Sequence, residues 1–452
     1  MTCLLHSSNR NLYISLLNLS FTSEDKNYYK LTLILFTPNP LSEIKRFFLF
    51  LRNKVDSKNY YTQMTQKNYS FFALLFLLVT IISCEKNEIK QIVAQPIDKN
   101  AIIDSTITAF EKKLLEQQID SVFKKYNFNG SVAVFKDSTK LYQKENGFSD
   151  FKTKTKIDDH TIFAIGSISK QFTAVMVLLE MEQGKLKTDD KVSKYLKEFQ
   201  TKEYENITIH QLLNHTSGLN LFGGKLMFKS GSNFFYSNDG FNALGKIIEK
   251  VSGRSYDENV LDLFKKAGMN SSSTGNVFRG TDFASAYLGN TKNAELIQNM
   301  PKRLGGKEIG IPAGGILSTI QDLNTWNNAL YGGKILNQET LQKFVAKSSE
   351  RQHQIFGKMG YGYGIMLNIG KPNAYFHSGY IKGSPSLNIY YPETKTSVII
   401  LSNIADEEKG KSSIFRPHIE IKKITDGIEN TVIDLRTKMI TPNEELISQR
   451  KD

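Results

Sequence analysis

The sequence predicts an α+β fold in which helices flank an antiparallel β-sheet that carries an inserted all-helical subdomain. Residues 131–135 (SVAVF) and 140–146 form an early pair of strands separated by turn residues. From about residue 168 to residue 355 helical patterns dominate. Short β-rich segments separated by turn residues follow at 361–369, 374–377, 386–391 and 397–401. Early and late strands that enclose a helical block indicate one sheet with an insertion, and the cleft between the two parts is the expected site.

An export signal is predicted inside the chain. Met64 opens a short basic stretch, residues 71–82 (FFALLFLLVTII) are apolar, and Ser83 and Cys84 follow directly. An apolar run of about 12 residues is too short for a membrane-spanning helix, which needs about 20. Residues 81–84 resemble the bacterial lipobox, so we expect a signal peptide at 64–83 and lipid on Cys84; the alternative is a leader with a chance cysteine. Several acyl chains would make a stable anchor.

Three segments lie outside the predicted sheet-and-helix domain and differ from it in composition. Residues 1–63 precede a signal that acts at an N-terminus, so we expect an over-extended start or an unstructured leader that is absent from the mature protein. Residues 84–106 are polar and predict a flexible tether. Apolar residues recur at helical spacing from 107 to 126, which opens a domain predicted to span 107–405. Residues 406–452 predict a helix followed by a disordered tail.

Charge and cysteine content exclude two classes of protein. The formal net charge of +13 is dispersed, because residues 85–452 carry about +8 with Lys and Glu interspersed. The clustered basic footprint of a nucleic-acid binder is therefore missing, and we expect no nucleic-acid partner. The two cysteines, Cys3 and Cys84, both precede the domain, so no disulfide framework holds it together.

A Ser-x-x-Lys tetrapeptide at Ser167 and Lys170 is the candidate nucleophile and base. The pattern occurs seven times in the chain, so context must select among its copies. At Ser167 an apolar stretch and a glycine lead into an amphipathic helix, whose first N–H groups and dipole favour developing negative charge. Lys170 lies three residues along the same helical face, and burial would ease the loss of its proton. An ordinary N-cap serine with a solvated lysine is the alternative for any single copy.

Two further segments become candidate parts of the same site when they are considered together with Ser167. Tyr236 and Asn238 are two residues apart, which in an extended loop turns both side chains to one side. His377 and Gly379 share one face of a predicted strand, with the glycine where a substrate backbone could approach closely. Taken alone, each segment is unremarkable, since a histidine on a strand is more often a structural hydrogen-bonding group.

Ser-x-x-Lys, then Tyr-x-Asn about 70 residues on, then His-Ser-Gly about 140 residues later resembles the serine β-lactamase family. The branch concerned contains class C β-lactamases, D-alanyl-D-alanine carboxypeptidases, D-aminopeptidases and esterases, which share the β-lactamase/transpeptidase-like fold. Residues 207–219 and 313–319 are similar to segments of this branch and are expected to be scaffold, His210 and His215 included. No Gly-x-Ser-x-Gly elbow is present in the sequence, which argues against an α/β-hydrolase.

The resemblance implies an acyl-enzyme mechanism. Ser167 attacks a carbonyl carbon, Lys170 and Tyr236 share the role of base, and water releases the acyl group. Asn238 orients Lys170 and hydrogen-bonds the substrate amide. Backbone N–H groups of Ser167 and Tyr380 form the oxyanion hole. No cofactor and no metal take part.

The third motif differs from that of the penicillin-binding proteins. His377 replaces a lysine whose charge can hold a substrate carboxylate, and Ser378 and Gly379 complete the predicted substrate-binding segment. The expected function is hydrolysis of an amide or ester in the bacterial cell envelope, on a D-amino-acid peptide or ester. The alternatives are a β-lactamase, which the histidine makes a side activity, and a catalytically silent envelope protein that binds a partner.

Overall fold

A computed structural model of the chain describes residues 13–22, 28–37 and 98–440, apart from 299, 301–302, 305–308 and 409. The chain forms two compact units, Met1–Gln95 and Pro96–Asp452. The predicted signal peptide, Cys84 and the first part of the predicted tether lie outside the described residues.

The first unit contains a hairpin of two antiparallel strands, β1 (Tyr13–Thr22) and β2 (Tyr28–Thr37). The prediction of an unstructured leader over residues 1–63 is therefore wrong for these two segments. Polar and apolar residues alternate over residues 17–22 (LNLSFT), the period of a strand with two different faces. The absence of residues 1–63 from the mature protein stays a prediction.

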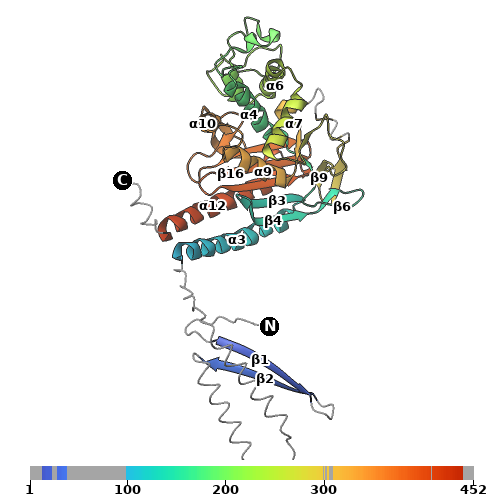
Figure 1. The fold of residues 1–452 in the computed structure, drawn as a ribbon. Helices are drawn as coiled ribbons and strands as arrows, with labels where there is room; N and C mark the ends of the chain where they lie inside the picture. Colours follow the sequence, from blue (N-terminus) through green and yellow to red (C-terminus); the bar gives the residue numbers. More distant parts are fainter. Residues whose placement is uncertain are drawn as a thin grey trace, which may run out of the picture. The chain divides into compact units, whose positions relative to one another are not determined.

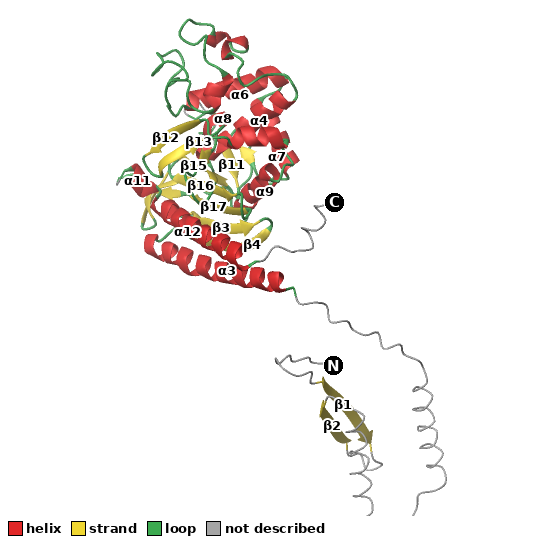
Figure 2. Cartoon of the chain, turned by 90° about the vertical axis from the view of Figure 1, so that its left-hand side faces the viewer, coloured by secondary structure: helices red, strands yellow, loops and turns green. Residues whose placement is uncertain are grey.

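The second unit is built around an eight-stranded sheet in which all neighbouring strands are antiparallel. The early hairpin and the late strands lie in one sheet, as the sequence predicts (Figure 2). Across the sheet the order is β12 (Ser349–His353), β13 (Gly357–Tyr361), β14 (Met366–Leu367), β15 (Tyr375–Ile381), β16 (Ser384–Tyr391), β17 (Thr396–Ser402), β3 (Gly130–Lys136) and β4 (Thr139–Asn146).

Two long helices lie side by side on one face of this sheet, α3 (Lys99–Tyr126) and α12 (Arg416–Met439) (Figures 1 and 2). Their apolar residues share one buried cluster with the outward face of β3, β16 and β17. Ion pairs join the helices near both ends, between Lys125 and Glu420 and between Arg436 and Asp104. The fold thus extends beyond the predicted limits of 107 and 405, because both helices are needed to cover the sheet.

The predicted tether is wrong over its last residues, because α3 begins at Lys99 and not at 107. Asp98 caps the helix by accepting a hydrogen bond from the Ala101 N–H at 3.1 Å. The first turns carry few apolar residues, and Ile102 is 54% exposed, so they show no helical periodicity in the sequence.

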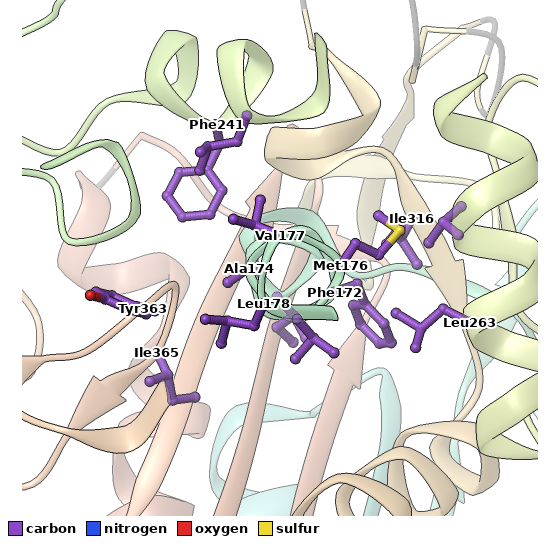
Figure 3. Packing of buried hydrophobic residues seen from close by; sticks show 14 of the residues in the cluster. Phe172, Ala174, Met176, Val177, Leu178, Phe241, Leu263, Ile316, Tyr363 and Ile365 are labelled. Carbon is purple, nitrogen blue, oxygen red and sulfur yellow. The ribbon is translucent and has the colours of Figure 1, made fainter. Parts of the chain in front are cut away.

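The opposite face of the sheet carries the helical part, centred on α4 (Ser169–Glu182). Figure 3 shows α4 with apolar side chains pointing outward in several directions, among them Phe172, Met176 and Leu178. A helix that is apolar all round is buried on all sides. The surrounding helices are α5 (Ile209–Leu213), α6 (Asn238–Ser252), α7 (Tyr256–Ala267), α8 (Ile311–Gly314), α9 (Ile320–Tyr331) and α10 (Gln338–Val345).

The expectation of an all-helical insertion over 168–355 is wrong in part, because short strands interrupt the helices. Strand β12, in the charged stretch SERQH, adds an edge to the main sheet that hydrophobic patterning does not reveal. The short strands outside the main sheet are β5 (Phe148–Asp150), β6 (Thr155–Lys156), β7 (Phe163–Ala164), β8 (Ser273–Thr274), β9 (Tyr287–Asn290), β10 (Asn293–Leu296), β11 (Ile316–Ser318) and β18 (Ile404–Ala405).

The predicted strand at 361–369 is divided in two. Strand β13 ends at Tyr361 and β14 begins at Met366, with Gly362 and Gly364 between them. Gly364 has a φ of +67°, and a Cβ at Gly362 would lie 2.5 Å from the Phe344 carbonyl oxygen, so the chain turns where side chains do not fit.

The C-terminal prediction is confirmed for the helix, which comprises the short α11 (Lys411–Ile414) and then α12. The predicted tail after residue 440 lies outside the described residues. Among the residues that the structure describes, no helix is both long and apolar enough to span a bilayer.

A buried carboxyl group between α12 and the sheet predicts a pH-dependent stability. Glu429 is 2% exposed, and desolvation raises its pKa from 4.5 to about 7. Between these values the folded state binds the proton that the unfolded state has lost, so the free energy of unfolding falls as the pH rises from about 4.5 to about 7. Glu429→Gln removes the ionisation and is expected to raise the free energy of unfolding at pH 8 by up to roughly 3 kcal/mol.

Urea unfolding at pH 5 and at pH 8 checks this result. Glu420→Gln on the same helix is the matched control, because Lys125 lowers the pKa of Glu420 and neutralising it brings no gain at pH 8. A gain for Glu429→Gln that is the same at both pH values would contradict the account.

Candidate active site

Ser167 lies in a 3₁₀ turn (Gly166–Ile168) that leads directly into α4. Gly166 has a φ of +52°, and an added Cβ there would lie 2.6 Å from the backbone nitrogen of Tyr380. A side chain at 166 is thus excluded on two grounds, strain and contact. The close approach sets the backbone around Ser167 against that of Tyr380, the two positions predicted for the oxyanion hole.

Lys170 is fully buried one turn below Ser167. Its Nζ lies 3.2 Å from Ser167 Oγ, 2.8 Å from Asn238 Oδ1 and 2.7 Å from the Ala313 carbonyl oxygen. Desolvation holds the pKa of Lys170 well below its usual range. The protonated amine donates to all three oxygens; in the neutral form two hydrogens suffice for the two carbonyl oxygens, which leaves the lone pair for the Ser167 hydroxyl proton.

The second predicted motif meets the first at this lysine. The Tyr236 ring centroid lies 4.8 Å from Lys170 Nζ, and Asn238, the first residue of α6, accepts from the same amine. Burial raises the pKa of Tyr236, and a hydrogen bond with the Ser167 side chain opposes that rise. The phenol therefore keeps its proton at neutral pH and lies within hydrogen-bonding reach of Ser167. The two residues meet at Lys170, as predicted, but only Tyr236 lines the cavity at Ser167, and Asn238 begins α6 instead of lying in an extended loop.

A cavity of about 870 Å³ opens at Ser167, and the third segment contributes Ser378 and Tyr380 to its wall. Gly379 does not line it. A Cβ at Gly379 would lie 1.9 Å from the Ile165 carbonyl oxygen and 2.4 Å from Ser386 Oγ. The prediction that a substrate approaches Gly379 is therefore wrong. The glycine is needed because a side chain there would separate β15 from the residues that precede Ser167.

His377 is brought near the site but not into the cavity. It is fully buried, and both ring nitrogens are engaged: Nδ1 lies 2.6 Å from the Ser378 carbonyl oxygen and Nε2 lies 3.0 Å from Tyr361 Oη. Burial lowers the pKa of His377 well below its usual value, so the ring is neutral. The predicted catalytic role of His377 is corrected accordingly, because no free nitrogen is left to contact a substrate.

The histidine belongs to a buried relay of hydrogen bonds that links the second and third motifs. The Ser237 N–H donates to His215 Nδ1 at 3.1 Å, and His215 Nε2 lies 3.2 Å from Tyr361 Oη. Because Nδ1 accepts, a neutral His215 carries its proton on Nε2 and donates to Tyr361, whose hydroxyl then donates to His377. Each ring nitrogen has one partner and one direction, so both tautomers are fixed.

His215 also positions Tyr236, a role that the sequence prediction of a scaffold residue understates. Its carbonyl oxygen accepts from the Phe235 N–H at 2.8 Å, and its ring accepts from the Ser237 N–H. The residues on both sides of Tyr236 are therefore tied to His215, whose ring packs against the Tyr236 ring at a centroid distance of 4.3 Å. A sequence pattern cannot show this, because positions 215 and 236 meet only in the folded chain.

Removing the hydroxyl at the centre of the relay is expected to cost stability. Tyr361→Phe leaves the Nε2–H of His215 and the Nε2 of His377 without partners, which lowers the free energy of unfolding by about 1–3 kcal/mol in urea denaturation. Tyr375→Phe in the same sheet is the control, because the Tyr375 hydroxyl makes no hydrogen bond within the described part of the chain. Equal losses in the two variants would show that the relay contributes nothing.

Part of the cavity wall was not predicted, namely the residues on β12 and in the segment before α11. Arg351 and His353 lie on β12, and Glu407 accepts a hydrogen bond from the Tyr380 hydroxyl. Over the described residues no group of His, Cys, Asp and Glu is arranged to hold a metal ion.

Comparisons with known proteins agree with this arrangement. A family model described as Beta-lactamase matches residues 107–416. A penicillin-binding protein of Bacillus subtilis is 26% identical over 343 residues, covering 68% of this chain and 75% of that protein. The octameric penicillin-binding protein homologue of Pyrococcus abyssi superposes with a TM-score of 0.59 at 28% identity, over 69% of this chain and 76% of that one. A D-amino acid amidase of Ochrobactrum anthropi has the same TM-score at 19% identity, over 71% of this chain and 99% of that one.

Proposed function

Because this chain belongs to the β-lactamase family, we propose that it hydrolyses an amide or ester through an acyl-enzyme on Ser167. The observation that carries the proposal is the desolvated amine of Lys170, which lies 3.2 Å from Ser167 Oγ with its other two contacts on carbonyl oxygens. A protein that only binds a partner has no need of a nucleophile with a buried base beside it.

We propose the following steps, which the contacts of Lys170 support. Ser167 Oγ bonds to the substrate carbonyl carbon while its proton passes to Lys170 Nζ, and the carbonyl π pair moves to the oxygen. Backbone N–H groups of Ser167 and Tyr380 hold that oxyanion. The proton then passes to the leaving group, directly or through the Tyr236 hydroxyl, as the bond to the leaving group breaks. Water repeats the sequence on the acyl carbon and frees Ser167.

A D-amino-acid peptide or ester is the proposed substrate. The D-amino acid amidase of Ochrobactrum anthropi shares the fold, and the relatives named as penicillin-binding proteins share the family. With His377 neutral and buried, the third motif supplies no cation for the carboxylate of a β-lactam, so β-lactam hydrolysis is the weaker candidate.

Turnover measurements on the purified protein test the proposal. Peptides ending in D-Ala-D-Ala, p-nitrophenyl esters and the β-lactam nitrocefin are compared by kcat/KM. We expect turnover of a peptide or ester above that of nitrocefin. Failure to hydrolyse any of them, together with no labelling of Ser167 by a fluorophosphonate, would sink the proposal in favour of a binding protein.

Export and lipid anchoring at the cell envelope are proposed from residues 64–84 alone. The mass of the mature N-terminal peptide, extracted from membranes, checks this: a diacyl or triacyl adduct on Cys84 is expected. An unmodified Cys84, or a mature chain that begins elsewhere, would exclude it.

A further inference from the structure

Arg351 occupies the middle of edge strand β12 with its side chain turned to the cavity at Ser167. Successive residues of a strand point to opposite faces. Its neighbour Glu350 is exposed and pairs instead with Lys347 at 2.7 Å and Lys358 at 3.1 Å. The nearest carboxylate in sequence is therefore neutralised elsewhere, on the far side of the strand.

The guanidinium of Arg351 has no polar partner among the residues that the structure describes. Its Cζ lies 5.1 Å from the centroid of the Phe234 ring and 5.2 Å from that of the Tyr236 ring. These cation–π contacts hold the group beside the two rings but leave its five N–H donors unused. The carboxylate that lines the same cavity, Glu407, accepts a hydrogen bond from the Tyr380 hydroxyl and makes no ion pair with Arg351.

A half-buried cation without a counter-charge is costly to the folded protein unless something else pairs with it. The N–H donors of the Arg351 guanidinium line the cavity, and His353, two residues along β12, lies on the same face of the strand. The ring of His353 accepts the Ile355 N–H at Nδ1, at 3.0 Å, so the neutral ring carries its proton on Nε2. Two donors of the same strand thus line the cavity that Ser167 also lines.

We propose that Arg351 binds a carboxylate of the substrate, so that the enzyme acts on acyl compounds bearing a free carboxylate and discriminates against neutral esters and amides. The inference rests on the proposed hydrolase function. Arg351 is the only permanently charged cation lining this cavity within the described residues, which matches one monoanion rather than a phosphate dianion. A planar guanidinium suits the two oxygens of a carboxylate.

The position fits a role in specificity rather than in bond breaking. Lys170 Nζ and Arg351 Cζ both lie against the Tyr236 ring, at 4.8 Å and 5.2 Å from its centroid. Both groups therefore contact the same aromatic side chain, and Arg351 is not among the hydrogen-bond partners of the Lys170 amine. A substrate whose carboxylate rests on Arg351 has its reacting carbonyl in the same cavity, which Ser167 also lines. Arg351 lies on β12 and not on β15, so it would hold a carboxylate at a different place from the lysine that the third motif lacks.

Matched substrates test the inference on the whole protein. One peptide is supplied with a free C-terminal carboxylate and again as its C-terminal carboxamide. Arg351→Gln is expected to lower kcat/KM for the acid by roughly 10- to 100-fold and to change that for the amide by less than about 3-fold. Arg254→Gln, at an exposed arginine paired with Asp262, is the control and should change neither.

The outcomes separate this inference from the function on which it rests. If Ser167 labels with a fluorophosphonate and both substrates lose activity equally in Arg351→Gln, the guanidinium acts only on the Tyr236 side chain and the carboxylate site is excluded. A wild type that prefers the amide excludes it as well. If Ser167 does not label and neither substrate turns over, the hydrolase function itself fails. Thermal unfolding of Arg351→Gln, expected at or above the wild-type Tm, confirms that the variant is folded.

Discussion

Replacing Ser167 with alanine is expected to lower kcat for every acyl substrate by at least about 10⁴-fold with little change in Tm. The loss is large because the hydroxyl is the atom that bonds to the substrate, and members of a catalytic unit fail together when one is removed. Stability is spared because Ser167 is only half-buried, and its Oγ is one of three contacts of the Lys170 amine. Steady-state kinetics with the preferred substrate, beside a thermal melt, measures both quantities.

The chain supplies a matched control for this variant. Ser121 and Lys124 repeat the Ser-x-x-Lys pattern on α3, where Ser121 is exposed and its hydroxyl donates to the Gln118 carbonyl oxygen. Ser121→Ala should leave kcat unchanged. Residual activity of Ser167→Ala within tenfold of the wild type would mean that a different group is the nucleophile.

Lys170→Met is expected to lower kcat by roughly 10³-fold or more. Methionine matches the length of the lysine stem but has no lone pair of comparable basicity, so Ser167 loses the group that accepts its proton. The Asn238 side chain and the Ala313 carbonyl group also lose their shared donor. Lys422→Met is the control, because Lys422 is a second buried lysine, paired with Asp426 on α12 and outside the cavity.

The role of Lys170 can also be measured through the pH dependence of the wild-type free energy of unfolding and of kcat/KM. Burial lowers the pKa of Lys170 in the folded state below its ordinary 10.5. As the pH falls from 10.5 toward the folded pKa, only the unfolded state gains this proton, so the Lys170 contribution to the free energy of unfolding falls. Below the folded pKa the contribution is constant, and kcat/KM declines there because the base is protonated. In Lys170→Met the change in stability over this range should disappear; if it persists, Lys170 is not its source.

The placement of the residues around Lys170 could be predicted from the sequence because each pair is local. Ser167 and Lys170 lie on one helical turn, and Tyr236 and Asn238 lie two residues apart, so spacing alone brings each pair to one side. The meeting of the two pairs at the Lys170 amine follows from the resemblance to a known family and is confirmed by the contacts.

The strand that carries the third motif shows where sequence patterning fails. Alternation places His377 and Gly379 on one face and Ser378 and Tyr380 on the other, but it does not tell which face lines a cavity. The structure turns Ser378 and Tyr380 to the cavity and buries the other pair against the chain before Ser167 and the Tyr361 hydroxyl.

Two elements were not predicted because no apolar pattern marks them: strand β12 and the first turns of α3. Strand β12 is polar over all of its residues and forms only by pairing with β13, so neither hydrophobic period nor β propensity marks it. Arg351 could not be recognised as part of the site for that reason. The first turns of α3 depend on the Asp98 cap rather than on an apolar face.

The central claim is that Ser167 carries the acyl group during turnover, and acid quenching tests it most directly. The protein is mixed with excess substrate, quenched within the first turnover, digested and analysed by mass spectrometry. The account predicts an added mass equal to the acyl group on the peptide that contains Ser167, absent from Ser167→Ala and present in Ser121→Ala. Turnover at an undiminished rate with the acyl group on another residue would contradict it.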